Sequence, residues 1–198
     1  MELDYIDLMI IHSPQPWAHF REDEHWFDGN LEAWRALEEA YKAGKLRAIG
    51  VSNFYPDRLI DLCRFTEIPP AVNQVETHVF QQQKKAHEIM EKYGVKHESW
   101  GPFAEGRKDY FTNPVLVEIG GKYGKTSAQT ALRFLLQSDV IVIPKSTHKE
   151  RMIENLNVFD FTLTDEDMEA IRALDEESSA FFSHYDPATV EFLTGLGK

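Results

Sequence analysis

The sequence contains one cysteine, Cys63, in 198 residues. A single cysteine excludes an intrachain disulfide and a cysteine-rich zinc site, and it suits a reducing compartment. No apolar run in the sequence approaches the roughly 20 residues that a transmembrane helix needs. The first residues, with Glu2 and Asp4 among them, lack the basic and apolar regions of a signal peptide. We therefore expect a cytoplasmic protein with no membrane partner.

Positive charge is also scarce, because 21 Lys and Arg residues stand against 33 Asp and Glu residues, for a net charge of −12. This balance argues against a general nucleic-acid surface or an anionic-membrane surface. The sequence contains no low-complexity segment, no linker and no break in composition. With 42% hydrophobic and 12% aromatic residues, the composition is that of a globular protein. We expect a single domain over residues 1–198.

Apolar strand-like runs alternate with amphipathic helical patterns along the chain. The run at 140–144, Val-Ile-Val-Ile-Pro, is apolar on both faces, as a parallel strand covered by helices should be. Repeated strand–helix units predict an α/β fold with a parallel sheet. We expect strands at 7–12, 46–51, 71–75, 95–100 and 140–144, and helices at 31–43, 56–65, 82–93, 114–123, 128–138, 149–157 and 165–174. Capped helix starts are predicted at Asn113, at Thr126 with Gln129, at Thr147 with Glu150, and at Thr164 with Asp167.

Polar or aromatic side chains follow each of the five strands. The strand ends carry His12, Ser52 and Asn53, Gln74, Trp100 to Pro102, and Lys145 with Ser146. The carboxyl ends of parallel strands meet at one face of such a fold, so these groups are expected to share a site. An imidazole, amides, a flat aromatic ring and a basic cluster suit a large phosphorylated ligand. A nicotinamide dinucleotide has those parts.

Five segments of the sequence resemble motifs of the aldo-keto reductases, in that family's order and spacing. Two of them are Gly-Lys-Leu-Arg-Ala-Ile-Gly-Val-Ser-Asn-Phe at 44–54 and Ile-Pro-Lys-Ser, with a later Arg and Glu-Asn, at 143–155. The others lie at 4–14, 73–76 and 100–103. The resemblance runs from about residue 3 to the C-terminus. It implies an NADPH-dependent carbonyl reductase of the (β/α)8 TIM-barrel class, with only about five strand units, the fourth to the eighth, in this incomplete barrel.

The resemblance also implies roles for the polar residues at the first four strand ends. Ser52, Asn53 and Gln74 would hold the carboxamide of the nicotinamide. Trp100 would stack on the nicotinamide ring. His12 would be the catalytic residue that orients the substrate carbonyl oxygen and stabilises the negative charge that develops on it.

The same resemblance places the other end of NADP(H) on the last motif. Lys145, Ser146 and Arg151 would bind the adenosine 2′-phosphate, and Glu154 and Asn155 would bind the adenine. Lys and Arg make strong charge-assisted bonds to a phosphate dianion, which favours NADP over NAD. The predicted cofactor-binding set is completed by Gly101, Pro102 and Phe103 along the pyrophosphate and by Thr147.

Each of these residues also has a purely structural interpretation. His12 can be a strand-end histidine bonded to backbone, and Ser52-Asn53 can be a turn that leads into a helix. Trp100 can belong to the core. Thr147 can cap a helix, although a helix N-terminus with nearby cations also binds phosphate.

Loops are expected to contribute to the substrate site. The connection from His12 to Asn30 is long, aromatic and charged, which favours a functional loop, and Trp17 in it is a candidate substrate contact. The acidic and histidine residues at 19–25 show no specific ligand spacing, so we expect no metal site. Phe181, Phe182 and His184 are candidates for a C-terminal substrate loop.

The resemblance fails at the proton donor. The family's tyrosine acid, with its lysine and aspartate, lies on three strand units that precede the segment resembling residues 5–12. No Tyr or Lys of this chain matches those positions. We therefore expect the 198 residues to be part of a longer protein, inactive on their own, with open barrel edges that can bind another chain. Two alternatives stay open: a truncated derivative that binds NADP or a partner without catalysis, and a truncated product with no function.

Overall fold

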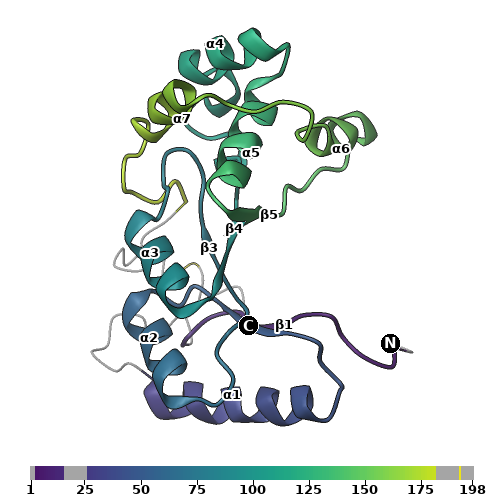
Figure 1. Cartoon of the computed structure of the whole chain (residues 1–198), viewed down its shortest axis with the longest axis vertical. Helices are drawn as coiled ribbons and strands as arrows, with labels where there is room; N and C mark the ends of the chain where they lie inside the picture. The colour runs from purple at the N-terminus through teal and green to yellow at the C-terminus, as the bar shows by residue number, and fades with distance from the viewer. Residues whose placement is uncertain (1–2, 16–25, 182–191, 193–198) are drawn as a thin grey trace. The chain divides into compact units, whose positions relative to one another are not determined.

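The computed structural model describes residues 3–15, 26–181 and 192. These residues form two compact units: residues 3–15, 26–75 and 84–96 make the first unit, and residues 76–83 and 97–181 make the second unit. The elements in chain order are β1 Met9–Ile11, α1 Phe27–Lys42, β2 Ile49–Ser52, α2 Pro56–Phe65, β3 Val72–Glu76, α3 Lys84–Tyr93, β4 Lys96–Trp100, η2 Ala104–Gly106, η3 Tyr110–Thr112, α4 Pro114–Tyr123, α5 Ser127–Gln137, β5 Val140–Val142, α6 Lys149–Leu156 and α7 Asp165–Arg172 (Figure 1).

The strands form a five-stranded sheet in the order β1-β2-β3-β4-β5. The pairs β1–β2, β2–β3 and β4–β5 are parallel. In the first unit Ile11 lies opposite Val51, and Ser52 lies opposite Gln74. The parallel α/β architecture predicted from the alternating patterns is therefore confirmed. All five strands lie within or at the ends of the predicted runs.

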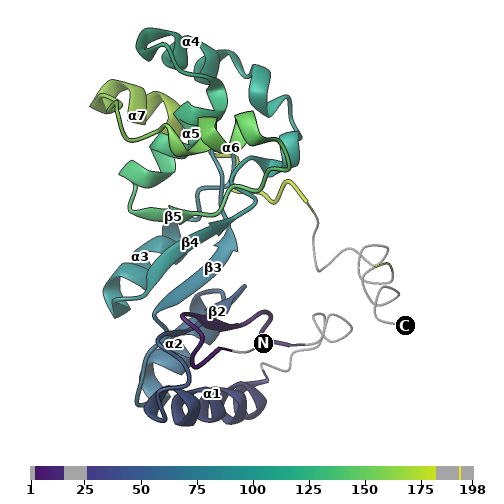
Figure 2. The same cartoon turned by 90° about the vertical axis from the view of Figure 1, so that its right-hand side faces the viewer.

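The core of the first unit lies between its helices and the strands β2 and β3. Helices α1, α2 and α3 pack side by side (Figures 1 and 2). Trp34 of α1 is fully buried, and its indole N–H donates to the Ile68 carbonyl at 2.9 Å. On the same helix, the Glu38 carboxylate accepts the backbone N–H groups of Glu67 and Ile68. These bonds tie α1 to the segment that follows α2.

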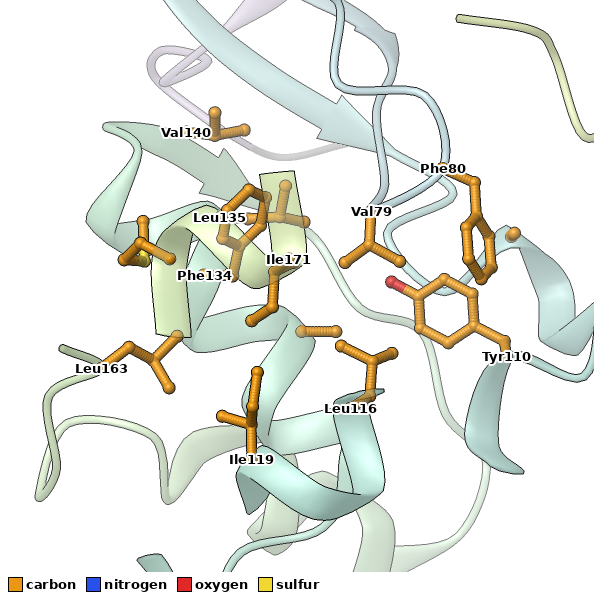
Figure 3. Close-up of a cluster of buried hydrophobic side chains, with 13 residues drawn as sticks. Val79, Phe80, Tyr110, Leu116, Ile119, Phe134, Leu135, Val140, Leu163 and Ile171 are labelled. Carbon is orange, nitrogen blue, oxygen red and sulfur yellow. The ribbon is translucent and has the colours of Figure 1, made fainter. Parts of the chain in front are cut away.

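The core of the second unit is built by α4, α5 and α7, with β5 packed against α5. Figure 3 shows its buried cluster, in which the Tyr110 ring lies against Phe80, with ring centroids 5.4 Å apart. The Tyr110 hydroxyl donates to the Pro102 carbonyl at 2.7 Å. Burial raises the pKa of Tyr110 far above its ordinary value, because the charged phenolate is disfavoured without solvent. Tyr110 is therefore a neutral core residue.

Three of the four predicted helix caps are present. Asn113 accepts from the N–H groups of the first turn of α4, and Thr126 forms a complete capping box with Gln129 at the start of α5. Thr164 accepts from the Asp167 N–H at the start of α7. The capping box predicted for Thr147 with Glu150 is wrong, because α6 begins after His148, which makes no side-chain cap bond.

Some predictions fall on residues that the structure does not describe. Trp17, residues 19–25, Phe182 and His184 lie outside the described ranges. Within residues 3–15 and 26–181, no helix is long and apolar enough to cross a membrane.

Candidate functional site

The ends of β2 and β3 in the first unit carry a hydrogen-bonded polar network. The Ser52 hydroxyl donates to the Gln74 carbonyl at 2.8 Å, and the Asn53 backbone N–H donates to the same carbonyl at 2.9 Å. The Asn53 amide nitrogen donates to the Ser52 hydroxyl and to the His12 carbonyl, each at 3.1 Å. Parallel pairing of β1, β2 and β3 thus brings together the four first-unit residues that were predicted to share a site.

The backbone at Asn53 has the left-handed conformation, with φ of 61°. Asparagine tolerates this conformation better than most residues. The turn begins as soon as β2 ends, so the side chains of Ser52 and Asn53 both stay beside the strand end. The structural interpretation of this pair as a turn before α2 and its functional interpretation are compatible. The two hydrogen bonds of the Asn53 side-chain amide fix its orientation. A group that binds a carboxamide needs such a fixed orientation.

His12 is exposed at the end of β1. Its backbone carbonyl, which accepts from Asn53 at 3.1 Å, is held by the network. An exposed imidazole at a strand end has the access to a small molecule that a buried histidine lacks. The alternative of a buried histidine bonded only to backbone does not describe this side chain.

Trp100 ends β4 in the second unit and is partly buried. Its ring lies 5.1 Å, centroid to centroid, from the Phe181 ring, with a tilt of 51° between the two planes. Gly101 follows with φ of 64°, and a Cβ atom there would meet the Phe181 ring at 3.0 Å. Both the left-handed backbone and the close approach of the ring favour glycine at this position.

The residues after Gly101 form a turn that is closed by a backbone hydrogen bond. The Ala104 N–H bonds the Gly101 carbonyl at 2.8 Å, and Phe103 packs its ring against Tyr110 and Phe111. The buried Pro102 has its carbonyl held by Tyr110. The predicted pyrophosphate segment is therefore anchored by contacts within the second unit.

A cavity of about 430 Å³ lies in the second unit, between the start of α6 and the segment around Phe111. Seven of the predicted cofactor residues line it: Phe103, Lys145, Ser146, Thr147, Arg151, Glu154 and Asn155. The remaining lining residues are Phe111, Ala128 and His148. These three unpredicted residues come from separate elements, and no local sequence pattern identifies them as cavity residues.

Two cationic side chains line the cavity. Lys145 and Arg151 are exposed there, and among the described residues neither side chain has a carboxylate at ion-pair distance. The Ser146 hydroxyl accepts from the His148 backbone N–H at 3.1 Å, which shapes the turn into α6. Cations, a hydroxyl and a helix N-terminus are the groups that bind a phosphate dianion. The donor set therefore fits the 2′-phosphate of NADP(H).

Acidic and neutral polar side chains also line the cavity. Glu154 accepts from the Thr126 hydroxyl at 2.5 Å, and its backbone carbonyl accepts from Gln129. Asn155 lines the cavity one residue further along α6. Glu154 thus holds α5 to α6 while it faces the cavity. Within the described part of the chain no group of His, Cys, Asp and Glu side chains is arranged to hold a metal ion.

The chain matches proteins of a known family. The model of the aldo/keto reductase family matches residues 1–176. A glyoxal reductase of Bacillus subtilis is 42% identical over 177 residues, which are 89% of this chain and 59% of that protein. The methylglyoxal reductase DkgA of Escherichia coli K12 is 38% identical over 176 residues, or 89% of this chain and 61% of that protein.

Solved structures are similar in fold as well as in sequence. The aldo-keto reductase MGS-M4 from a deep-sea metagenome is 39% identical with a TM-score of 0.84, over 93% of this chain and 65% of that one. The silkworm aldo-keto reductase AKR2E5 in complex with NADPH is 31% identical with a TM-score of 0.79, over 93% and 57% of the two chains. The chain spans about three-fifths of the length of the curated relatives that it matches.

Proposed function

The chain belongs to the aldo/keto reductase family, and from that premise we propose that it takes part in the NADPH-dependent reduction of aldehydes or ketones, as part of a longer protein. The observation that carries this proposal is the cavity of the second unit, where Lys145, Ser146 and Arg151 face a space of about 430 Å³. NADP(H) is the cofactor that this donor set and the family both support. When bound, it supplies the hydride that is added to the carbonyl carbon.

The second unit would bind the adenosine end of the cofactor. Lys145 and Arg151 pair with the 2′-phosphate, and the Ser146 hydroxyl adds a neutral hydrogen bond. Glu154 and Asn155 contact the adenine. The residues Gly101, Pro102, Phe103 and Thr147 complete the proposed cofactor contacts of the second unit. Because NAD(H) lacks the 2′-phosphate, the two cations favour NADP(H).

The family resemblance supplies roles for residues at the reacting end of the cofactor. Ser52, Asn53 and Gln74 hold the nicotinamide carboxamide, whose donor and acceptor atoms match their amides and hydroxyl. By the family resemblance, Trp100 stacks on the nicotinamide ring. His12 binds the carbonyl oxygen of the substrate and stabilises its developing negative charge. A proton must then reach that oxygen to give the alcohol.

The proton donor is the part of the reaction that these residues do not supply. The family's tyrosine, lysine and aspartate have no counterparts at matching positions in this chain. A tyrosine with an ordinary pKa near 10 is a weak acid at neutral pH, so an unmatched tyrosine is a poor substitute. We therefore propose that the 198 residues bind NADPH but turn over no carbonyl on their own.

The two edge strands of the sheet are proposed to belong to an incomplete barrel and to bind a partner. The 198 residues are one partial domain of a (β/α)8 barrel, and β1 and β5 end the order of its sheet. Exposed apolar side chains lie on or beside these strands, among them Met9, Ile141 and Ile143. The unpaired edge of a parallel strand can form hydrogen bonds with a further strand. We therefore propose another chain or segment as a partner, in addition to the small carbonyl substrate. The single cysteine supports the cytoplasm as the compartment.

The test uses the native protein isolated from its source cells. We expect an intact mass about 10 kDa above that of this chain, equivalent to three barrel units, and NADPH oxidation with glyoxal or methylglyoxal as probe substrates. His12→Gln in that protein should lower kcat by about 10²- to 10³-fold, as loss of an oxyanion donor does, and should leave NADPH affinity unchanged. The purified 198-residue chain should not oxidise NADPH. Turnover at ordinary enzyme rates would refute the account of the missing acid.

A second candidate function is NADP binding without catalysis. It is favoured by the contrast between the nearly complete set of cofactor residues and the unmatched proton donor. A native mass of 22.9 kDa, together with saturable quenching of tryptophan fluorescence by NADPH and no turnover, would establish it. A folded native protein that shows no saturable quenching would rule out both functions.

A further inference from the structure

The second unit contains a buried hydrogen-bonded pair, Glu76 and His78, that the proposed chemistry does not use. Glu76, at the end of β3, is 3% exposed, and His78 is fully buried. The Glu76 carboxylate lies 3.0 Å from His78 Nε2. The Phe80 N–H points at the other ring nitrogen of His78, at 3.3 Å. With that nitrogen accepting, Nε2 carries the ring hydrogen and donates a hydrogen bond to the Glu76 carboxylate.

The same carboxylate holds a segment about 100 positions later in the chain. The Ser179 hydroxyl donates to Glu76 at 2.6 Å, and the Ala180 N–H donates to it at 2.8 Å. A buried carboxylate is stable only when hydrogen bonds replace its lost hydration. Here three donors do so, and two of them come from residues 179–180. The segment is therefore fastened to the end of β3.

Arg107 fastens the segment from its other side. Its guanidinium donates to the Ala180 carbonyl at 2.9 Å and to the Phe181 carbonyl at 3.3 Å. The same guanidinium lies over the Phe181 ring, 4.9 Å from the centroid. Phe181 thus has its backbone and its ring held by one cation.

The held ring is directed at the stacking residue. The centroid of the Phe181 ring lies 5.1 Å from that of the Trp100 ring and 6.4 Å from that of the His78 ring. The Phe181 ring also lies over Gly101, which has no Cβ atom in the way. An indole that stacks on a flat ligand must keep one orientation. Fixing it in advance removes an entropic cost from binding. The contacts around Phe181 provide that restraint.

We propose that Glu76, His78 and Arg107 fix residues 179–181 so that Phe181 buttresses Trp100, which makes Phe181 a positioning residue for the nicotinamide ring. The proposal rests on the proposed role of Trp100 in cofactor binding. It concerns a residue that does not itself bond the cofactor. Phe181 was expected from the sequence only as part of a substrate loop.

The experiment compares two ligands on the full chain and its variants. NADPH carries the nicotinamide, whereas adenosine 2′,5′-bisphosphate reaches only the cavity of the second unit. Phe181→Ala should weaken NADPH binding by about three- to tenfold, the worth of an aromatic pair, and should change bisphosphate binding by less than about twofold. Phe181→Leu should restore part of the loss. Phe159→Ala, which removes a 70% exposed ring, is the matched control and should change neither affinity.

Tryptophan emission gives a readout that does not need a ligand. Subtracting the spectrum of a Trp100→Phe variant isolates Trp100 in each background. Phe181→Ala and, more weakly, Glu76→Gln should make this component easier to quench with acrylamide, whereas Phe159→Ala should not. Unchanged quenching of Trp100 would overturn the proposal. NADPH affinity that is unchanged or higher in Phe181→Ala, or an equal loss for both ligands, would overturn it as well.

Failure of the proposed function has a different signature. A folded wild-type chain that binds neither ligand would contradict the cofactor assignment and with it the nicotinamide part of this inference. The acrylamide comparison alone would then decide whether Phe181 holds Trp100. Binding of both ligands without the predicted difference in Phe181→Ala would instead leave the cofactor assignment intact and refute the positioning role.

Discussion

Removing the two cations of the cavity should abolish the preference for NADPH over NADH. Lys145 and Arg151 line the cavity and lie outside any ion pair in the described part of the chain, so a bound phosphate would be their principal partner. A hydrogen bond to a charged group contributes about 1.5–3 kcal/mol. Both side chains are exposed, and solvent screens such pairs, so the lower value applies to each. Together they account for about 3 kcal/mol, on the order of a hundredfold in affinity.

The assay is equilibrium binding of NADPH and NADH to the wild-type chain and to the double variant Lys145→Gln, Arg151→Gln. NADPH affinity should fall on the order of a hundredfold, and NADH affinity should stay within about twofold, because NADH presents no 2′-phosphate. Lys149→Gln is the matched control, since it removes an exposed lysine of α6 that does not line the cavity. It should leave both affinities unchanged.

Ionic strength provides a second signature of the same charges. Raising the salt concentration should weaken NADPH binding to the wild-type chain more than binding to the double variant, because exposed charges are screened. An NADPH-to-NADH preference that survives in the double variant, or that Lys149→Gln removes equally, would refute the assignment of the 2′-phosphate to Lys145 and Arg151.

Three further predictions concern the stability that supports the site. Leu132→Ala removes a fully buried side chain of the second unit and should cost about 3–4 kcal/mol in denaturant unfolding; a loss below about 1 kcal/mol would contradict the packing. Glu38→Ala leaves two backbone N–H groups without their acceptor and should cost about 2–3 kcal/mol, whereas Glu38→Gln keeps the acceptor oxygen and should cost about 1 kcal/mol; equal losses would contradict the charged contact. For Asp167, burial works to raise the pKa, but hydrogen bonds from Lys122 and the neighbouring Tyr123 outweigh it and lower the pKa. The stabilisation from ionised Asp167 is therefore complete above the unfolded-state pKa of about 3.9 and is lost as pH falls through the folded-state pKa. Asp167→Asn should make the free energy of unfolding less dependent on pH in this acid range. An unchanged pH dependence would contradict the prediction.

Much of the fold is predictable because its signals are local. The proline of α2 and the Asn113-Pro114 pair of α4 mark helix starts within one or two residues, and both predicted ranges agree with the structure. Strand ends are less well defined. The strand predicted at 7–12 is Met9–Ile11, because its length depends on pairing with the neighbouring strand rather than on the run itself.

The wrongly predicted cap reflects a helix start that lies one residue later than the capping-box pattern predicts, with His148 and not Thr147 in the N-cap position. Thr147 and Glu150 have the spacing of a capping box, but the Ser146 hydroxyl takes the His148 N–H and α6 begins at Lys149. The spacing alone does not say which hydroxyl reaches which N–H. Local patterns of this kind locate a turn to within a residue or two.

The parts of the site that the sequence did not reveal depend on distant contacts. Glu76 meets Ser179 and Ala180 across about 100 positions of the chain, and nothing near Glu76 in the sequence indicates such a partner. Phe111 reaches the cavity from η3, and Ala128 reaches it from α5. Strand ends were informative because parallel pairing places them together whatever the loops do.

The most direct test of the cofactor assignment is 31P NMR of NADP+ titrated with the 198-residue chain. The account predicts that the 2′-phosphate resonance shifts and broadens with saturation, and that the Lys145→Gln, Arg151→Gln variant suppresses this change. A 2′-phosphate resonance that stays at its free position in the presence of a folded, saturating excess of the chain would contradict the account.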